Sequence, residues 1–165
     1  MNKDELKNVL EKHLKWLKGE KDGERADLTR ANLTGADLTG AVLTDADLEN
    51  VKNLFYPLAC PEEGSFIAFK KASRYIVKLC ISEDAKRSSA TGRKCRCDKA
   101  SVVSIQNTDG TTAYGVTEVG SDYDRNFTYR IGEEVTSTFD PDRWNECAPG
   151  IHFFVTREEA VRYKG

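Results

Sequence analysis

The sequence predicts a mainly β protein made of an N-terminal helix, a coil of five-residue repeats and a small α+β domain. Three observations predict this. Apolar residues recur at helical spacing before residue 20, leucine recurs at every fifth position from residue 28 to residue 48, and short β-type runs follow Pro57. We therefore expect a capping helix at 1–20, a repeat coil at 21–55 and an α+β domain at 56–165.

The segment from Asp4 to Leu17 predicts an amphipathic helix. Its apolar side chains recur at spacings of three and four residues and so share one face. They are Leu6, Val9, Leu10, Leu14 and Leu17. Gly19 is a suitable residue to end the helix. His13 and Trp16 lie near the apolar face, and we expect both to pack there.

The strongest pattern is a five-residue repeat that begins at Ala26. Alanine holds the first position of five consecutive repeats and leucine holds the third. The leucines are Leu28, Leu33, Leu38, Leu43 and Leu48. A period of five fits neither an α-helix nor a β-strand, but it fits a coil that turns a corner every five residues. We expect the leucines to point inward, with Thr, Asp, Asn and Gly at the corners.

These repeats, from Ala26-Asp-Leu-Thr-Arg to Ala46-Asp-Leu-Glu-Asn, resemble the pentapeptide-repeat family, whose consensus is A-(D/N)-L-x-x. The resemblance implies a short right-handed quadrilateral β-helix in which four repeats form one coil. Repeat coils bury their cores only against neighbouring repeats. A coil this short therefore needs another element packed on each of its two ends. We expect the N-terminal helix to cap one end. The downstream domain or a second copy of the chain would cover the other, making the coil an assembly platform in a homo-oligomer.

The chain after Pro57 predicts the α+β domain. Six short runs have β-type composition: 66–70, 75–81, 101–106, 112–116, 127–131 and 151–155. Ser82 is placed to cap a short helix. Thr156-Arg-Glu-Glu is a capping box for a final helix that extends to about Tyr163.

Composition and charge narrow the function classes. Hydrophobic residues make up 39% of the 165 and charged residues 32%, which predicts a folded chain. A net charge of −2 gives no overall attraction to nucleic acid or membrane, so an electrostatic partner must meet a local patch. Sequence-specific binding of nucleic acid is not expected, because no helix-turn-helix or zinc-finger spacing is present. Five cysteines, an odd number, and the lack of a long apolar run predict a cytoplasmic protein with free thiols.

Two stretches, 86–97 and 144–154, together with Arg157-Glu-Glu-Ala160, are similar to an uncharacterised domain found behind short pentapeptide repeats in bacteriophage and bacterial proteins. The resemblance implies a phage-type protein of a bacterial or infected host cell, with no known activity. We predict a non-catalytic protein that binds a host protein or a phosphorylated small molecule and so counters host defence. No cofactor is expected. A purely structural assembly protein is an alternative.

The basic segment 86–99 is the candidate anion site. It holds six basic residues against one acid, Asp98, with hydroxyl residues among them. Backbone amides, hydroxyls and cationic side chains together bind phosphate groups well. The candidate ligand-binding residues are Lys86, Arg87, Ser88, Ser89, Thr91, Arg93, Lys94 and Arg96. A solvated basic loop is the alternative interpretation.

Cys95, Cys97, Cys147 and His152 are groups of the kind that bind zinc. We expect packing instead of a metal site, because Cys-x-Cys is tighter than the usual zinc spacing. Cys147 with His152 is also the candidate nucleophile and base of an alternative, enzymatic function. The stretch 150–163 is similar to the Gly-Ile-Tyr-Phe…Ala…Tyr stretch of ADP-ribosyltransferase-type folds, which implies NAD chemistry as a further alternative.

Overall fold

Two structural units make up the chain. The computed structural model describes residues 1–36, 38, 41–124 and 126–164. The first unit comprises Met1–Pro57 and Asp142–Glu146, and the second comprises Leu58–Pro141 and Cys147–Gly165. The helix and the repeats, predicted as separate parts, therefore belong to one unit. Within the described residues, no helix combines the length and the apolar character that crossing a bilayer requires.

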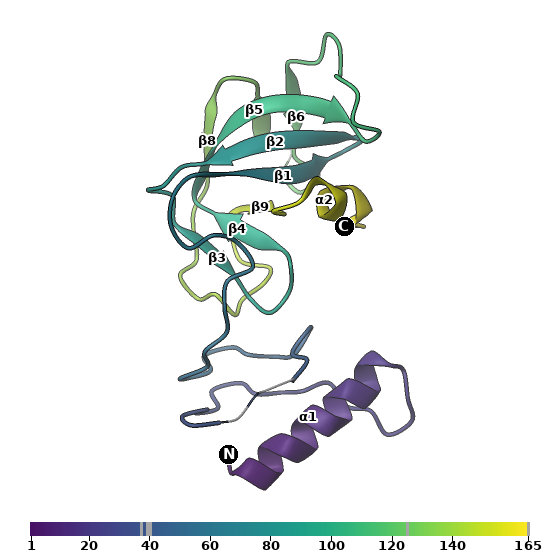
Figure 1. The fold of residues 1–165 in the computed structure, drawn as a ribbon, viewed down its shortest axis with the longest axis vertical. Coiled ribbons are helices and arrows are strands. Elements are labelled where there is room, and N and C mark those ends of the chain that lie inside the picture. The colour runs from purple at the N-terminus through teal and green to yellow at the C-terminus, as the bar shows by residue number, and fades with distance from the viewer. Residues whose placement is uncertain (37, 39–40, 125, 165) are drawn as a thin grey trace. The chain divides into compact units, whose positions relative to one another are not determined.

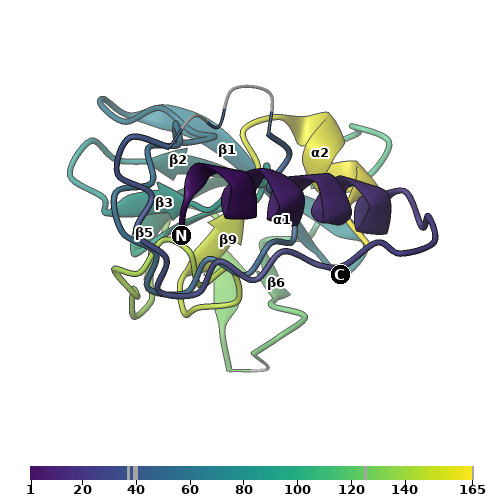
Figure 2. The same ribbon diagram turned by 90° about the horizontal axis from the view of Figure 1, so that it is seen from below.

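Helix α1 (Lys3–Leu17) confirms the predicted N-terminal helix. It begins at a capping box, in which the Asn2 side chain accepts a hydrogen bond from the Glu5 amide and the Glu5 carboxylate accepts one from the Asn2 amide. Leu6 is buried, and Val9 and Leu10 pack against the leucines of the repeats. Figure 2 shows α1 running alongside the repeat segment. The part of the apolar face that carries Leu6, Val9 and Leu10 is thus buried against the repeats, whereas Leu14 on the same face is exposed.

His13 attaches α1 to the repeat segment through two hydrogen bonds. Its ring is fully buried and stacks on Trp16. Nδ1 accepts a hydrogen bond of 3.2 Å from the Ala26 amide. Because that nitrogen is an acceptor, Nε2 carries the proton and donates to the Thr44 carbonyl at 2.9 Å. One imidazole therefore satisfies two main-chain groups that the helix would otherwise bury without partners, a role beyond the packing predicted from the sequence.

The repeat segment turns every five residues. Amides at 31, 36, 41, 46 and 51 each donate to the carbonyl of the leucine three positions earlier. The fifth position adopts a positive φ in the described repeats that end at Arg30, Gly35, Asp45 and Asn50. This left-handed conformation explains why Gly, Asn and Asp recur there. Parallel bridges join Asp27 to Asp47 and residue 32 to residue 52, so segments four repeats apart lie side by side.

The leucines of the repeats gather in one apolar cluster with Leu6. Leu28, Leu33, Leu43 and Leu48 are buried and Leu38 is partly buried. Trp144, from the short segment that returns to the first unit, packs against the same cluster. The cluster is the core of the first unit.

Antiparallel sheets form the second unit, as Figure 1 shows. The main sheet has the order β1-β2-β5-β8 and contains β1 (Phe66–Ala72), β2 (Tyr75–Ile81), β5 (Lys99–Asn107) and β8 (Glu134–Thr136). A second sheet contains β3 (Arg87–Ser89), β4 (Cys95–Cys97) and β9 (Ile151–Phe153). The third pairs β6 (Glu118–Gly120) with β7 (Thr128–Arg130). A bridge from Phe69 to Phe154 joins the first two sheets, and α2 (Arg157–Arg162) follows β9.

Several sequence predictions for this unit are confirmed and three are wrong. Strand β2 has the predicted bounds, and Thr156 caps α2 in a capping box with Glu159. The short helix after Ser82 is a turn, closed by the Ala85 amide on the Ser82 carbonyl. The run 112–116 forms a turn with one bridge to β5, and the segment 86–99 forms the β3–β4 hairpin instead of a loop. At all three positions short-range main-chain hydrogen bonds, within a turn or between neighbouring segments, decide the conformation over composition.

The leucine cluster leads to a prediction for stability. Leu43 is 1% exposed, so Leu43→Ala should lower the free energy of unfolding of the first unit by about 2–5 kcal/mol. Its neighbour Val42 is 45% exposed, and Val42→Ala should change it by no more than about 0.5 kcal/mol. Urea unfolding followed by tryptophan fluorescence measures both, because Trp16 and Trp144 lie in the first unit. Equal losses in the two variants would contradict the buried cluster.

Candidate functional site

A cavity of about 630 Å³ lies on the second unit, where segments far apart in the sequence meet. Its positive side chains come from β1, from the turn after β1, from the residue before β4 and from the end of α2. They are Lys70, Lys71, Arg74, Lys94 and Lys164. Among the described residues that line it, Asp122 is the one carboxylate. A chain with a net charge of −2 thus concentrates positive charge around one cavity.

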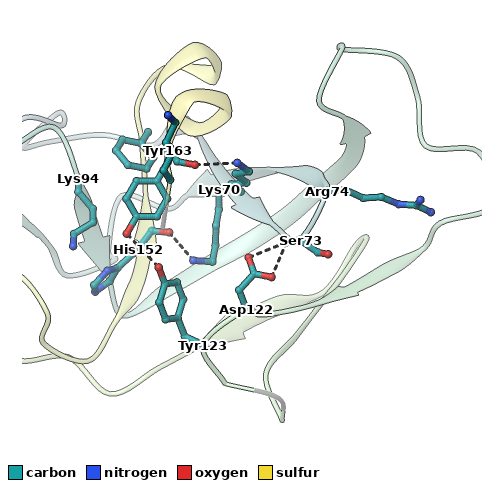
Figure 3. A pocket seen from close by; sticks show the side chains of 11 residues that line it. Lys70, Ser73, Arg74, Lys94, Asp122, Tyr123, His152 and Tyr163 are labelled. Atoms are coloured by element: carbon teal, nitrogen blue, oxygen red, sulfur yellow. Dashed lines mark hydrogen bonds between the residues drawn. The ribbon is translucent and has the colours of Figure 1, made fainter.

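Lys70 is the buried cation of this cavity. Its position on β1 shares a face with Ala68 and Ala72, which belong to the core, and Lys70 itself is only 8% exposed. Its ammonium donates to the main-chain carbonyl of His152 at 3.3 Å and lies 5.9 Å from the centre of the Tyr129 ring. Figure 3 shows it pointing into the space between His152, Asp122 and Tyr123.

Keeping the buried Lys70 side chain charged costs free energy. Burial lowers the pKa of Lys70, and the nearby Lys94 lowers it further, whereas Asp122 opposes the shift. Asp122 is itself held in place, because both of its oxygens accept from the Ser73 amide at 2.9 Å. Ser73 has a φ of 56°, in the tight turn between β1 and β2. This turn therefore fixes the position of the carboxylate that acts on Lys70.

His152 forms part of the cavity wall beside Lys94 (Figure 3). Its Nε2 lies 2.9 Å from the Ala148 carbonyl, a bond that orients the ring. Burial lowers the pKa of His152, with further lowering from Lys94, Lys70 and Arg96, while the bond to Ala148 raises it. The positive charges of Lys70 and Lys94, which line this wall, and of Arg96 therefore all act on the imidazole of His152.

Aromatic rings form most of the remaining wall. The Tyr123 and Tyr163 hydroxyls lie 3.3 Å apart, and Tyr163 packs against Phe154 with 5.2 Å between ring centroids. Lys71 donates to the Tyr163 carbonyl at 2.9 Å, which fixes the end of α2 next to β1. Tyr163 is thus held rigidly, whereas Tyr123 is 70% exposed.

The structure separates the basic residues that the sequence proposed as one anion site. Lys94 lines the cavity, but Arg93 pairs with Glu159 through a contact of 2.6 Å. Arg96 is buried, donates to the Asp140 carbonyl and lies over the Phe139 ring. The Arg87 guanidinium donates to main-chain carbonyls of Pro61, Gly64, Ser82, Glu83 and Ala85. These three arginines support the hairpin.

The remaining candidates of that segment also lie apart from the cavity lining. Ser88 and Ser89 are buried on β3, and the Ser89 hydroxyl accepts from the Ala59 amide. Thr91 is half-buried in the turn between β3 and β4, and Lys86 is exposed before β3. Of the eight proposed residues, Lys94 is the one placed on the cavity wall.

The candidate zinc ligands divide between two faces of the β4–β9 pair. Cys95 lies opposite Phe153 and Cys97 opposite Ile151, whereas His152 lies opposite Arg96 and so points to the other face. The thiols of Cys95 and Cys97 are buried; burial raises the pKa of Cys97 to about 12, and contact with Cys60 raises that of Cys95. Cys147 is exposed. In the described part of the chain, no group of three or more His, Cys, Asp or Glu residues is placed to hold a metal ion.

Sequence reasoning missed most of the cavity. The pattern of β1 contains the clearest signal that was available, since Lys70 falls on the same face as Ala68 and Ala72 and is therefore directed toward the core. Tyr123 and Asp122 lie in a polar stretch with no periodicity. Only the fold brings them to β1.

Repeats in one unit and antiparallel sheets in the other define the chain as a pentapeptide-repeat protein with an added β-rich domain. Comparison with known families agrees: pentapeptide repeats (8 copies) match residues 24–52, which confirms the predicted resemblance. A family of unknown function (DUF5758) matches residues 56–160, and the chain belongs to that family. No curated protein and no solved structure matches the chain.

The lowered pKa of His152 predicts how stability depends on pH. As pH falls through about 6.5, the usual pKa of histidine, the unfolded chain takes up a proton that the folded chain resists. The free energy of unfolding of the second unit should therefore decrease between pH 7.5 and pH 5. His152→Gln keeps a donor for the Ala148 carbonyl and should flatten this decrease. Urea unfolding followed by tyrosine circular dichroism measures it, and an unchanged pH profile in the variant would contradict the assignment.

Proposed function

We propose that the protein is a non-catalytic binding protein and that its second unit binds a phosphorylated small molecule in the cationic cavity. The observation that supports this most directly is the clustering of five cationic side chains and one carboxylate among the described lining residues, with one of the cations, Lys70, buried. Phosphate oxygens accept hydrogen bonds from ammonium groups and compensate their charge. The cavity volume, about 630 Å³, lies in the range of roughly 300–1,000 Å³ that small-molecule sites occupy.

The concave shape favours a small molecule over the host protein that the sequence analysis also considered. The enzymatic alternative gains little from the geometry, because the Nε2 of His152 is directed to the Ala148 carbonyl and the Cys147 thiol, in the segment before β9, is exposed. A phage-type setting, a role in countering host defence and a cytoplasmic location stay hypotheses that rest on the sequence. They do not affect the proposal for the cavity.

For the first unit, we propose a right-handed quadrilateral β-helix coil that serves as an assembly platform for a second copy of the chain. The bridges between residues four repeats apart and the turns at five-residue intervals support the coil. Apolar side chains left on its surface support assembly. Phe55 is 91% exposed, and Val42 and Leu14 are exposed as well.

Binding of pyrophosphate tests the proposed cavity. Isothermal titration calorimetry should detect pyrophosphate binding that weakens as salt increases, because the attraction is electrostatic. Lys94→Gln should weaken it about tenfold, which corresponds to roughly 1.4 kcal/mol. Lys86→Gln is the matched control: it removes an exposed lysine of the same basic segment outside the cavity and should change the affinity less than about twofold. No binding, or equal effects of the two variants, would refute the proposal.

Light scattering tests the proposed assembly. The chain should elute as a dimer or larger species whose mass falls on dilution. Phe55→Ser replaces the most exposed apolar side chain of the first unit and should shift the population toward the monomer. Tyr114→Ser, which removes an equally exposed ring from the second unit, is the control and should leave the mass unchanged. A monomer at every concentration would exclude the platform.

A further inference from the structure

The cationic cavity is larger than a phosphate group requires. A water molecule occupies about 30 Å³ in the liquid, so a phosphate of five heavy atoms fills on the order of 100 Å³. The cavity has about 630 Å³. A phosphate held by the lysines would leave most of this volume to the remainder of its molecule, and the residues around that remainder determine what it is.

Rings dominate the part of the wall that carries no charge. Tyr123, Tyr163, Phe154 and His152 all line the cavity, and Figure 3 shows the first, second and last of these around the ends of Lys70 and Lys94. Tyr163 is held by Phe154 and by the bond from Lys71 to its carbonyl, so its ring is a fixed surface. The exposed Tyr123 ring is joined to it through the two hydroxyls. Aromatic faces next to cations suit a flat aromatic group that carries phosphate.

We infer that the ligand is a nucleoside phosphate, with its phosphate against Lys70 and Lys94 and its base stacked on the Tyr123–Tyr163 pair. This inference rests on the proposed function of the cavity and specifies its ligand class. A sugar phosphate would use the lysines equally well but would gain little from the rings. Stacking of a base on a ring tolerates different bases, so purine and pyrimidine nucleotides should both bind.

The experiment compares ligands of equal charge that differ only in the base. Calorimetric titrations with AMP, UMP and ribose 5-phosphate measure the contribution of the base, and pyrophosphate measures the cationic site alone. We expect both nucleotides to bind at least about tenfold more tightly than ribose 5-phosphate. Tyr123→Leu should remove most of this difference, because it takes away the exposed ring, and should leave pyrophosphate affinity unchanged. Tyr123→Phe keeps the ring and should retain the difference.

The outcomes separate the inference from the proposed function. If pyrophosphate binds but AMP, UMP and ribose 5-phosphate bind equally, the cavity takes phosphates and the nucleotide inference is overturned. If AMP binds tightly but Tyr123→Leu or Lys94→Gln fails to weaken it, the base or the phosphate lies elsewhere and the inference is likewise overturned. If none of the four ligands binds, the proposed function itself fails. Circular dichroism of each variant verifies that it is folded, and a variant that unfolds is replaced by Tyr123→Met.

Discussion

The buried ammonium of Lys70 is the constraint on which the cationic cavity depends. A core-facing position of a strand normally carries an apolar residue, because burying a charge in a low-dielectric interior costs free energy. At Lys70 this cost is offset in part by the His152 carbonyl, by the Tyr129 ring and by the field of Asp122. Lys94 acts in the opposite direction. An anion in the cavity would relieve this imbalance, which is why the position of Lys70 favours a phosphate-bearing ligand.

The elements around Lys70 hold its neighbours in place, so the excess of positive charge in the cavity persists in the folded chain. The tight turn at Ser73 fixes Asp122, the Ala148 carbonyl orients His152, and Lys71 secures Tyr163. Each of these contacts involves the main chain, so none of them draws a second carboxylate toward Lys70. Acidic side chains of the second unit neutralise cations elsewhere: Glu159 pairs with Arg93 and Asp84 with Lys99. The positive potential of the cavity is therefore built into a rigid frame, which lowers the entropic cost of ligand binding.

The sequence predicts the first unit far better than the cavity. Helix α1 and the five-residue turns follow from local patterns, since each leucine and each residue with positive φ is specified by its own repeat. The β3–β4 hairpin was missed because its basic residues mimic a solvated loop, although Arg87 in fact holds main-chain carbonyls. The cavity was missed because its wall is assembled from separate segments, and pairing between distant strands decides which side chains meet. Two residues named from the sequence lie on the wall: Lys94, from the basic segment, and His152, which was named there as a zinc ligand or a base.

The local origin of the contacts in the first unit also limits what its repeats indicate about function. Every contact that defines the repeat segment, from the buried leucines to the His13 bonds, serves its own packing. A coil of this kind presents a surface, and its apolar exposed residues suit contact with another copy. Ligand recognition needs polar or charged groups that are buried at a cost to stability. Among the described residues, Lys70 is a buried charged group that also lines a cavity. This contrast supports the proposal that ligand recognition resides in the second unit and that the first unit serves assembly.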